Sequence, residues 1–387
     1  MSPLLTHLER RRREMVALIH KLVELESPSS NKAAADRCAA FLAAELKARG
    51  AKLSVNRQQH WGDHLVATFG GSRSAGRASR LRKSKRPIML LGHYDTVWEV
   101  GTLAHMPWRQ RAGRLYGPGV FDMKAGIAIM LFAVDALRER TDALPRDVIV
   151  SLNGDEEVGS PSSRSCTEAL ARRSAAVLVL EPAQATAVKT ARKGIGTFSI
   201  TVRGVAAHSG LDFFLGQNAI VELAWQIERV SEFTDRARGL TVNVGVVCGG
   251  TRTNVVPAEA AAEIDVRFAS PRDGRELLRK FERLRPINKH CRLEVSGGIN
   301  RPPMERTPAV AALYQQAQAA AAELGFELPE AAVGGGSDGN FTGALGIPTL
   351  DGLGAVGEGA HAASESVDID WLPKRAALLA RLIETID

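Results

Sequence analysis

Short apolar runs alternate with helical patterns over the first 190 residues. Apolar residues at helical spacing predict helices over 4–25 and 33–49, and Ser27-Pro28 breaks the pattern between them. Several β-rich runs have the length of strands, and one segment is apolar almost all round, as in a helix packed deep against a sheet. We predict strands at 52–56, 65–69, 88–91, 148–152 and 177–180, and the buried helix at 123–138.

Glycines and Pro118 precede Asp122 and predict irregular backbone between the central strand and the buried helix. Strands that alternate with helices are typical of an α/β fold. The sequence therefore predicts an α/β domain built around a mixed sheet.

The pattern changes after about residue 193. The predicted order becomes β-α-β-β-α-β, which is the ferredoxin-like arrangement. Its strands are 197–202, 242–247, 261–268 and 292–295, and its helices are 219–230 and 275–284. Helices at 307–324 and 373–386 then resume the α/β pattern. We therefore expect a small α+β domain at 191–303, inserted into a larger domain formed by 1–190 and 304–387.

Composition agrees with a globular chain of two domains. At 387 residues the chain exceeds the usual size of a single core, and its 45% hydrophobic and 24% charged residues are ordinary. No apolar run approaches the roughly 20 residues that span a bilayer, and charges interrupt the N-terminus before a signal-peptide core develops. We therefore expect a cytoplasmic protein without a membrane partner. The four cysteines form no C-x-x-C pair, which argues against a zinc ribbon or a disulfide framework.

The net charge of +7 is local. Seven basic residues and no acidic residue lie at 72–86, and without them basic and acidic residues number 43 each. The segment is rich in Ser, Gly and Arg and lies between two predicted strands, which favours a mobile hairpin loop. The alternative, contact with an anion or RNA, lacks the interleaved aromatic residues of a nucleic-acid surface. We therefore expect no nucleic-acid partner.

The stretch P-I-M-L-L-G-H-Y-D-T-V at 87–97 carries the first candidate chemistry. His93 and Asp95 follow the apolar strand, and residues two apart on extended backbone point to the same side. In open α/β sheets ligands bind beyond the strand ends. Alone, this pair is equally compatible with a structural histidine beside a solvated aspartate.

Further acids and histidines stand where predicted strands end or in glycine-rich turns. The full set is His93, Asp95, Asp122, Glu156, Glu157, Glu181 and His361. So many carboxylates in one place repel one another unless a cation neutralises them. Histidine with carboxylates and without cysteine suits catalytic zinc, or manganese or cobalt, and the number of ligands exceeds one tetrahedral set. The set therefore predicts two metal ions that share a bridging carboxylate.

At these motifs the chain resembles the co-catalytic dizinc hydrolases, a family that includes glutamate carboxypeptidase, aminoacylase, acetylornithine deacetylase and succinyl-diaminopimelate desuccinylase. The likeness runs through nearly the whole chain and is strongest to glutamate carboxypeptidase. The motifs are G-H-Y-D-T-V at 92–97, G-V-F-D-M-K-A-G at 119–126, N-G-D-E-E-V-G-S at 153–160, L-E-P at 180–182 and G-G-G-S-D-G at 334–339.

The resemblance implies two zinc ions per subunit, with cobalt or manganese as possible substitutes. By that likeness Asp122 bridges the ions, His93 and Glu181 complete one site, and Glu157 and His361 complete the other.

It also implies that Glu156 is the general base for the metal-bound water, and that the Asp95 carboxylate orients His93. Adjacent glutamates point in opposite directions on extended backbone. On a loop, however, one can ligate while the other reaches the water.

The inserted domain of this family is a lid and a dimer interface, so the resemblance implies a homodimer. His208 and Asn254 match lid residues that reach the partner subunit's site and help to hold the substrate or its oxyanion. Arg301 matches an arginine that binds a free C-terminal carboxylate, and Gly336 lies in the glycine-rich motif at the substrate site.

The sequence thus predicts a zinc-dependent hydrolase that releases a C-terminal, glutamate-like amino acid from a peptide or an N-acyl conjugate. Family members that act as aminopeptidases have Asp where this chain has Glu181, whereas carboxypeptidases and deacylases have Glu. The alternative activity is an N-acyl amino acid deacylase of the acetylornithine or succinyl-diaminopimelate type. A catalytically dead scaffold is disfavoured because no ligand or base is missing.

Overall fold

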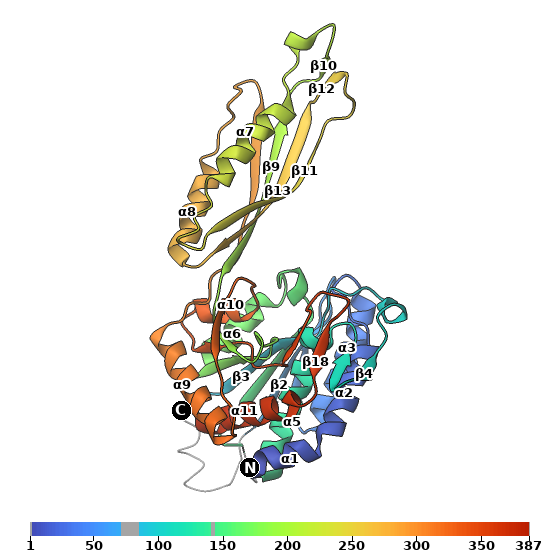
Figure 1. Cartoon of the computed structure of the whole chain (residues 1–387), viewed down its shortest axis with the longest axis vertical. Helices are drawn as coiled ribbons and strands as arrows, with labels where there is room; N and C mark the ends of the chain where they lie inside the picture. The colour runs from blue at the N-terminus through green and yellow to red at the C-terminus, as the bar shows by residue number, and fades with distance from the viewer. Residues whose placement is uncertain (1, 71–84, 141–143, 387) are drawn as a thin grey trace. The chain divides into compact units, whose positions relative to one another are not determined.

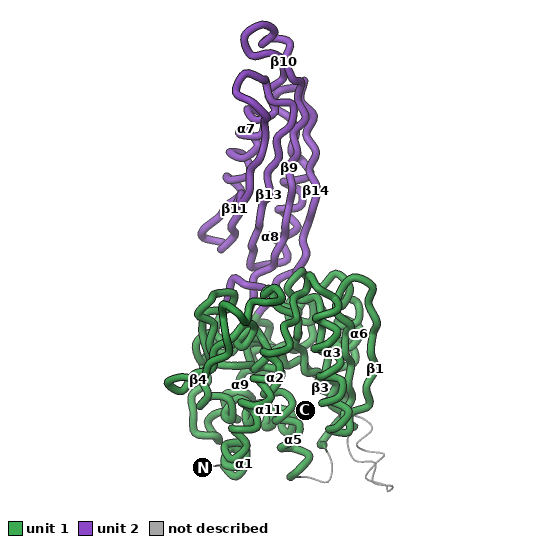
Figure 2. The backbone as a smooth tube through the Cα atoms, turned by 90° about the vertical axis from the view of Figure 1, so that its right-hand side faces the viewer, with its two compact units in different colours: residues 1–191, 306–332, 337–387 green, residues 192–305, 333–336 purple. Residues whose placement is uncertain are grey.

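The chain folds into two units and passes between them more than once. The computed structural model describes residues 2–70, 85–140 and 144–386. Unit 1 comprises Met1–Ala191, Arg306–Ala332 and Ser337–Asp387, and unit 2 comprises Arg192–Glu305 and Val333–Gly336 (Figures 1 and 2). The glycine-rich motif is therefore divided, because residues up to Gly336 go with unit 2 and those from Ser337 go with unit 1.

A six-stranded mixed sheet forms the centre of unit 1. Its order is β1 (Lys52–Asn56), β2 (His64–Phe69), β6 (Val148–Asn153), β3 (Ile88–His93), β7 (Ala176–Val179) and β16 (Thr349–Leu350). β3 runs parallel to β6 and β7, and β16 runs parallel to β7. β1 and β2 form an antiparallel edge. The predicted mixed α/β fold is confirmed.

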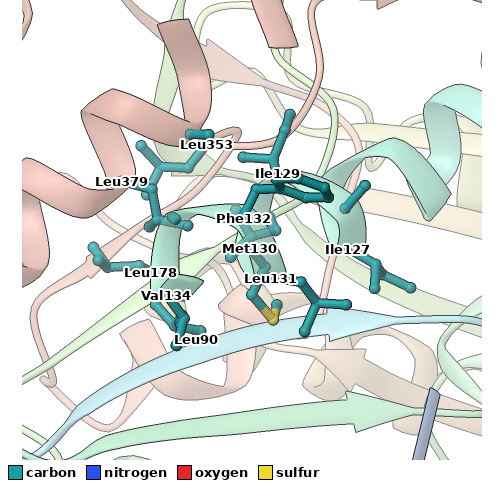
Figure 3. Packing of buried hydrophobic residues seen from close by; sticks show 14 of the residues in the cluster. Leu90, Ile127, Ile129, Met130, Leu131, Phe132, Val134, Leu178, Leu353 and Leu379 are labelled. Carbon is teal, nitrogen blue, oxygen red and sulfur yellow. The ribbon is translucent and has the colours of Figure 1, made fainter. Parts of the chain in front are cut away.

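Alternate side chains of β3 point to opposite faces of this sheet. Leu90 packs with the apolar helix α5 (Ala125–Arg140), which is itself covered by α11 (Trp371–Thr385) (Figure 3). Met89 and Leu91 point to the opposite face, toward α6 (Arg164–Arg173). Helices thus cover both faces, as a parallel sheet core requires.

Gly126 explains how close α5 comes to the end of β7. A Cβ atom at this position would lie 2.2 Å from the main-chain oxygen of Leu180. Any larger residue there would force the helix away from the sheet, one residue before Glu181.

The first predicted helix is in fact two helices. α1 (Pro3–Arg10) and α2 (Arg12–Glu24) are separated at Arg11, where φ is −90° and ψ is 5°. Continuous helical spacing of apolar residues does not reveal this break. The remaining helices of unit 1 are α3 (Lys32–Ala48), α9 (Pro308–Glu323) and α10 (Gly339–Ala344).

A small four-stranded sheet corrects the prediction of irregular backbone before Asp122. Its order is β17 (Gly357–Glu358), β18 (Ser366–Asp368), β5 (Arg114–Tyr116) and β4 (Arg109–Arg111). Ala112 and Gly113 close the β4–β5 hairpin with φ angles of 51° and 77°. Two positive φ angles suit a tight hairpin turn, although alanine is a rare residue at the first of them.

Unit 2 has the ferredoxin-like topology. Its elements are β9 (Gly194–Arg203), α7 (Ala219–Ser231), β11 (Thr241–Gly249), β13 (Glu259–Phe268), α8 (Pro271–Glu282) and β14 (Arg292–Arg301). The sheet is antiparallel with the order β11-β13-β9-β14, so β11 and β14 are its edges (Figure 2). Two further strands, β10 (Ala207–His208) and β12 (Val255–Val256), form a short ribbon that the sequence did not predict.

The chain also contains several short strands and turns. They are β8 (Val188–Arg192), which pairs with β15 (Glu330–Val333), the 3₁₀ turns η1 (Thr102–Ala104), η3 (Glu156–Val158) and η4 (Phe213–Leu215), and the π turn η2 (Val120–Lys124). The four cysteines are free thiols. Of the basic segment 72–86, only Lys85 and Arg86 lie within the described residues. No described helix has both the length and the apolar character needed to cross a membrane.

Candidate active site

Three parallel strands end at one edge of the main sheet and bring the first candidate residues there. His93 is the last residue of β3, η3 starts three residues after β6, and Glu181 lies two residues after β7. His93 and Glu181 are buried, at 1% and 6% exposure. The carboxyl ends of neighbouring parallel strands lie side by side, so the fold alone gathers these side chains.

Asp122 lies between the two histidines. Its Oδ1 is 3.2 Å from Nε2 of His93, and its Oδ2 is 3.4 Å from Nε2 of His361. Each carboxylate oxygen therefore faces a different imidazole. This is the arrangement required of a carboxylate that bridges two ions.

One further carboxylate accompanies each histidine. Oε1 of Glu181 lies 3.5 Å from Nε2 of His93, and Oε2 of Glu157 lies 3.3 Å from Nε2 of His361. Glu156 also approaches, because ligand atoms of His93, Glu156 and Glu181 all lie within 4.8 Å of one another. The structure thus brings together the predicted metal ligands and the predicted base.

Asp95 lies beside His93 and also contacts the turn of the two glutamates. Nδ1 of His93 lies 3.0 Å from the main-chain oxygen of Asp95 and 3.5 Å from its carboxylate. A main-chain oxygen only accepts, so Nδ1 carries the proton and Nε2 is left as a ligand. The carboxylate also accepts hydrogen bonds from Oγ of Ser29 at 2.6 Å and from the main-chain N–H groups of Glu156 and Glu157, each at 3.2 Å. It therefore holds the turn that carries the two glutamates.

The acids and histidines of the cluster have strongly shifted pKa values. Burial raises the pKa of Glu157 to about 7, even though His361 beside it acts in the opposite direction. Burial alone would lower the pKa of His93, but hydrogen bonds to Asp122, Asp95 and Glu181 raise it well above its usual value. Hydrogen bonds to Asp122 and Glu157 raise the pKa of His361 to about 10.

Glu157 gives the most direct sign of a metal ligand. Its Oε1 is buried and has no hydrogen-bond partner among the described residues. A buried carboxylate oxygen without a partner is costly unless it ligates a metal ion. Hard oxygen and imidazole ligands in two sets suit divalent ions such as zinc, manganese or cobalt. The residues present therefore fit a metal pair.

His361 occupies a strained and half-exposed position. Its φ angle is 63°, in the left-handed region that costs a residue with a side chain about 1 kcal/mol or more. Its side chain is 51% exposed, whereas that of His93 is 2% exposed. Among these ligands, His361 is thus the one that solvent reaches, since the side chains of Asp122 and Glu157 are 15% and 7% exposed.

Two acids that support the site were not predicted. Asp338 accepts hydrogen bonds from Nδ2 of Asn153 at 2.6 Å and from Oγ of Ser160, which flank the turn of the two glutamates. Glu365 is fully buried and accepts hydrogen bonds from the turn of Asp122. Burial raises the pKa of Glu365, and its hydrogen-bond donors offset part of that rise. Asp338 belongs to the G-G-G-S-D-G motif at 334–339, but no pattern along the sequence indicates Glu365.

The predicted substrate-binding residues all lie in unit 2, in two separate places. His208 belongs to the ribbon β10–β12, where Asn254 directly precedes β12, and both residues are exposed. Arg301 ends β14 and is buried, at 4% exposure. A Cβ at Gly336 would lie 2.9 Å from Cδ of Arg301, so the glycine makes room for that side chain.

The main-chain N–H groups of Gly210 and Leu211 donate to Nδ1 of His208, each at 3.1 Å. Nδ1 is therefore an acceptor, and the neutral ring carries its proton on Nε2. His208 thus offers an N–H donor to solvent, as a residue that stabilises an oxyanion must.

Two ligand sets joined by one carboxylate, with a further glutamate beside them at the end of a mixed sheet, define a binuclear metallohydrolase site. The family model described as peptidase family M20/M25/M40 matches residues 89–385, and the chain belongs to this family. The predicted family and the predicted class, a metal-dependent hydrolase of amide bonds, are confirmed.

Relatives extend over most of the chain. Carboxypeptidase G2 of Pseudomonas sp. (strain RS-16) is 30% identical over 377 residues, which are 95% of this chain and 88% of that protein. Succinyl-diaminopimelate desuccinylase of Acidovorax ebreus (strain TPSY) is 27% identical over 324 residues, 78% of this chain and 81% of that protein. The crystal structure of aminopeptidase PepT from Bacillus cereus ATCC 10987 has the same fold, with a TM-score of 0.77 and 21% identity over 97% of this chain and 98% of that one.

Substitution of the histidines tests the two ligand sets. We expect the purified protein to hold two divalent ions per chain and His93→Ala and His361→Ala each to hold fewer, because each imidazole faces a different oxygen of Asp122. Metal analysis of the dialysed proteins measures the content directly. Unchanged content in both variants would remove these residues from the metal centre.

Proposed function

We propose that the protein uses two zinc ions per subunit to release a C-terminal, glutamate-like amino acid from a peptide or an N-acyl amino acid. Cobalt or manganese would substitute for zinc. The observation that carries the proposal is the sharing of Asp122 between two ligand sets, with Glu156 beside one of them. Carboxypeptidase G2 covers nearly the whole chain and supports the same direction of cleavage.

The protein's own residues have distinct tasks in this reaction. The metal pair, when bound, would supply Lewis-acid chemistry that activates a water molecule and polarises the scissile carbonyl. Glu156 takes the proton from the attacking water and returns it to the leaving amine. The Asp95 carboxylate holds Glu156 in place through its main-chain N–H. The N–H of His208 stabilises the developing oxyanion.

A deacylase of the desuccinylase type is the second candidate. The relative from Acidovorax ebreus supports it, since 81% of that protein matches this chain. Both reactions break an amide bond beside a free carboxylate and use the same metal centre. They differ in the group on the other side of the bond, so a panel of dipeptides and N-acyl amino acids, assayed with each metal, separates them.

The positions of His208 and Arg301 support a homodimer in which His208 acts on the partner's substrate. Arg301 pairs with Ile195 at the start of β9, and His208 follows the far end of that strand. The eight residue-to-residue steps from Ile195 to Arg203 span roughly 27 Å of extended chain. One small substrate cannot touch both side chains of the same unit 2, so if both residues bind the substrate, one of them comes from the partner subunit.

The surface of unit 2 provides an edge for such a dimer. β11 is an edge strand, and Val246 and Val247 on it are 58% and 57% exposed. Ile220, Val221 and Trp225 of the adjacent helix α7 are also exposed, at 41%, 42% and 39%. An exposed apolar edge strand is a template for pairing with a second copy. A lid function for unit 2, the cytoplasmic location and the absence of a nucleic-acid partner stay predictions.

Amidation of the substrate tests the direction of cleavage. If Arg301 binds the free carboxylate, the amide of the same substrate should lose roughly 2 to 4 kcal/mol of transition-state binding, because a charged pair is broken. Arg301→Ala should then lose activity on the acid and scarcely change the poor activity on the amide. The measurement is kcat/KM for both substrates with both proteins. Equal losses on acid and amide would mean that Arg301 only supports the fold.

A further inference from the structure

Glu365 lies where the two chain segments that form the metal centre meet. It follows His361 by four residues and directly precedes β18. The main-chain N–H of Glu365 donates to the oxygen of Ala362 at 2.9 Å, and that of Ala362 donates to the oxygen of Gly359 at 2.8 Å. The loop that carries His361 is therefore tied back on itself at Glu365.

Both carboxylate oxygens of Glu365 accept hydrogen bonds. Oε1 accepts hydrogen bonds from the main-chain N–H groups of Phe121 at 2.8 Å and Asp122 at 2.9 Å. Oε2 accepts from the main-chain N–H of Gly119 at 3.0 Å and from Nε1 of Trp98 at 2.9 Å. Four donors thus converge on one buried carboxylate, and three of them are main-chain groups of the turn that presents Asp122.

This arrangement requires a carboxylate. Residues 119–122 belong to a turn between β5 and α5, not to a sheet ladder that could supply other acceptors. Only an ionised carboxylate offers acceptors on both oxygens and no donor. A buried N–H group without an acceptor is strongly disfavoured, so the position of the turn depends on Glu365.

We propose that Glu365 is the positioning residue that holds the bridging carboxylate of Asp122 between the two ligand sets and thereby sets the metal affinity of both sets together. This inference rests on the proposed binuclear centre. Glu365 fixes the main chain of Asp122 from the same loop that carries His361. The bridging ligand of the first chain segment and the terminal ligand of the second are thus placed by one side chain.

Loss of a shared ligand should change the metal affinities differently from loss of a terminal ligand. Removal of His361 takes away one ligand of one ion. Displacement of Asp122 takes a ligand from both ions. Loss of Glu365 should therefore weaken both binding events, and outer partners of metal ligands typically contribute about 10- to 100-fold to affinity.

Glu365→Gln is the sharpest variant because it preserves size. Glutamine has one acceptor oxygen, and its amide N–H₂ would face two N–H donors in either orientation. Glu358→Gln is the matched control, since Glu358 lies in the same segment but pairs with Arg114 and has a 68% exposed side chain. Glu365→Asp keeps the acceptors and shortens the side chain, so it should be impaired less than Glu365→Gln.

The experiment is a titration of the metal-stripped, full-length protein with Co²⁺, followed by calorimetry and by the visible absorption of the bound cobalt. We expect two binding events in the wild type, both weakened about 10- to 100-fold in Glu365→Gln. His361→Ala should keep one event near the wild-type affinity, and Glu358→Gln should keep both. Thermal unfolding of each metal-free protein shows whether it is folded. If Glu365→Gln is not folded, the cobalt affinities of Glu365→Asp are compared with those of the wild type instead. Glu365→Asp should weaken both binding events to a smaller extent.

Each remaining result contradicts the proposal. Weakening of only one event, or of neither, in a folded Glu365 variant would show that Glu365 does not act through the bridging ligand. An equal effect of Glu358→Gln would mean that any change in this loop disturbs the centre. A wild-type protein that binds no cobalt and hydrolyses nothing would overturn the proposed function itself, which is a distinct result.

Discussion

Glu156→Gln should lower kcat by about 10²- to 10⁴-fold and leave the metal content of the protein unchanged. Glutamine matches the size of glutamate but cannot accept the proton of the attacking water. The anchor of the residue is preserved, since its main-chain N–H, and not its side chain, donates to Asp95. Steady-state kinetics together with metal analysis of the same preparation measure both effects.

Glu157→Gln is the matched comparison, because it makes the same chemical change at the neighbouring residue. Its carboxylate faces His361, and its second oxygen is buried without a partner among the described residues. This variant should lose metal from one site. Glu156 also lies within ligand distance of His93 and Glu181, so a fall in metal content in Glu156→Gln would identify it as a ligand.

Two inactive variants should restore activity when their subunits are exchanged. Glu156→Gln lacks the base and His208→Ala lacks the oxyanion donor. A hybrid dimer contains one site with both residues if His208 acts in the partner's site. Random exchange of equal amounts makes about half of the dimers hybrid, so about a quarter of the wild-type activity should return.

The controls are each variant taken alone through the same exchange procedure. Subunit exchange is verified by mass spectrometry of differently tagged chains. Exchange without any return of activity would place His208 in the site of its own chain. It would also remove the strongest reason for a second subunit, namely the separation of His208 and Arg301 along β9.

Much of the metal centre could be predicted because the fold relates it simply to the sequence. His93 and Glu181 follow apolar runs, and the ends of parallel strands gather at one edge of a sheet. The periodicity of 197–202 and of the segments after it was likewise sufficient to predict the ferredoxin-like order. These features depend on local patterns and on general rules of topology.

The features that were missed depend on contacts between distant residues. Glu365 is one acid in a polar stretch until the fold places it against the turn of Asp122, 243 residues away. The hydrogen bond from the main-chain N–H of Glu156 to the carboxylate of Asp95 likewise joins residues that are 61 positions apart. The break at Arg11 does not interrupt the apolar spacing, so periodicity could not reveal it.

The insertion of unit 2 has a consequence for the order in which the centre can mature on the ribosome. His93, Asp122, Glu157 and Glu181 are synthesised before unit 2, whereas His361 and Glu365 emerge after it. N-terminal segments generally fold first during synthesis. A nascent chain can therefore present the whole first ligand set, and Glu157 of the second, while the turn of Asp122 still lacks the carboxylate of Glu365. If Glu365 has the proposed role, we expect tight binding of both ions only after the segment that follows unit 2 has docked, so metal acquisition would be a late step in folding.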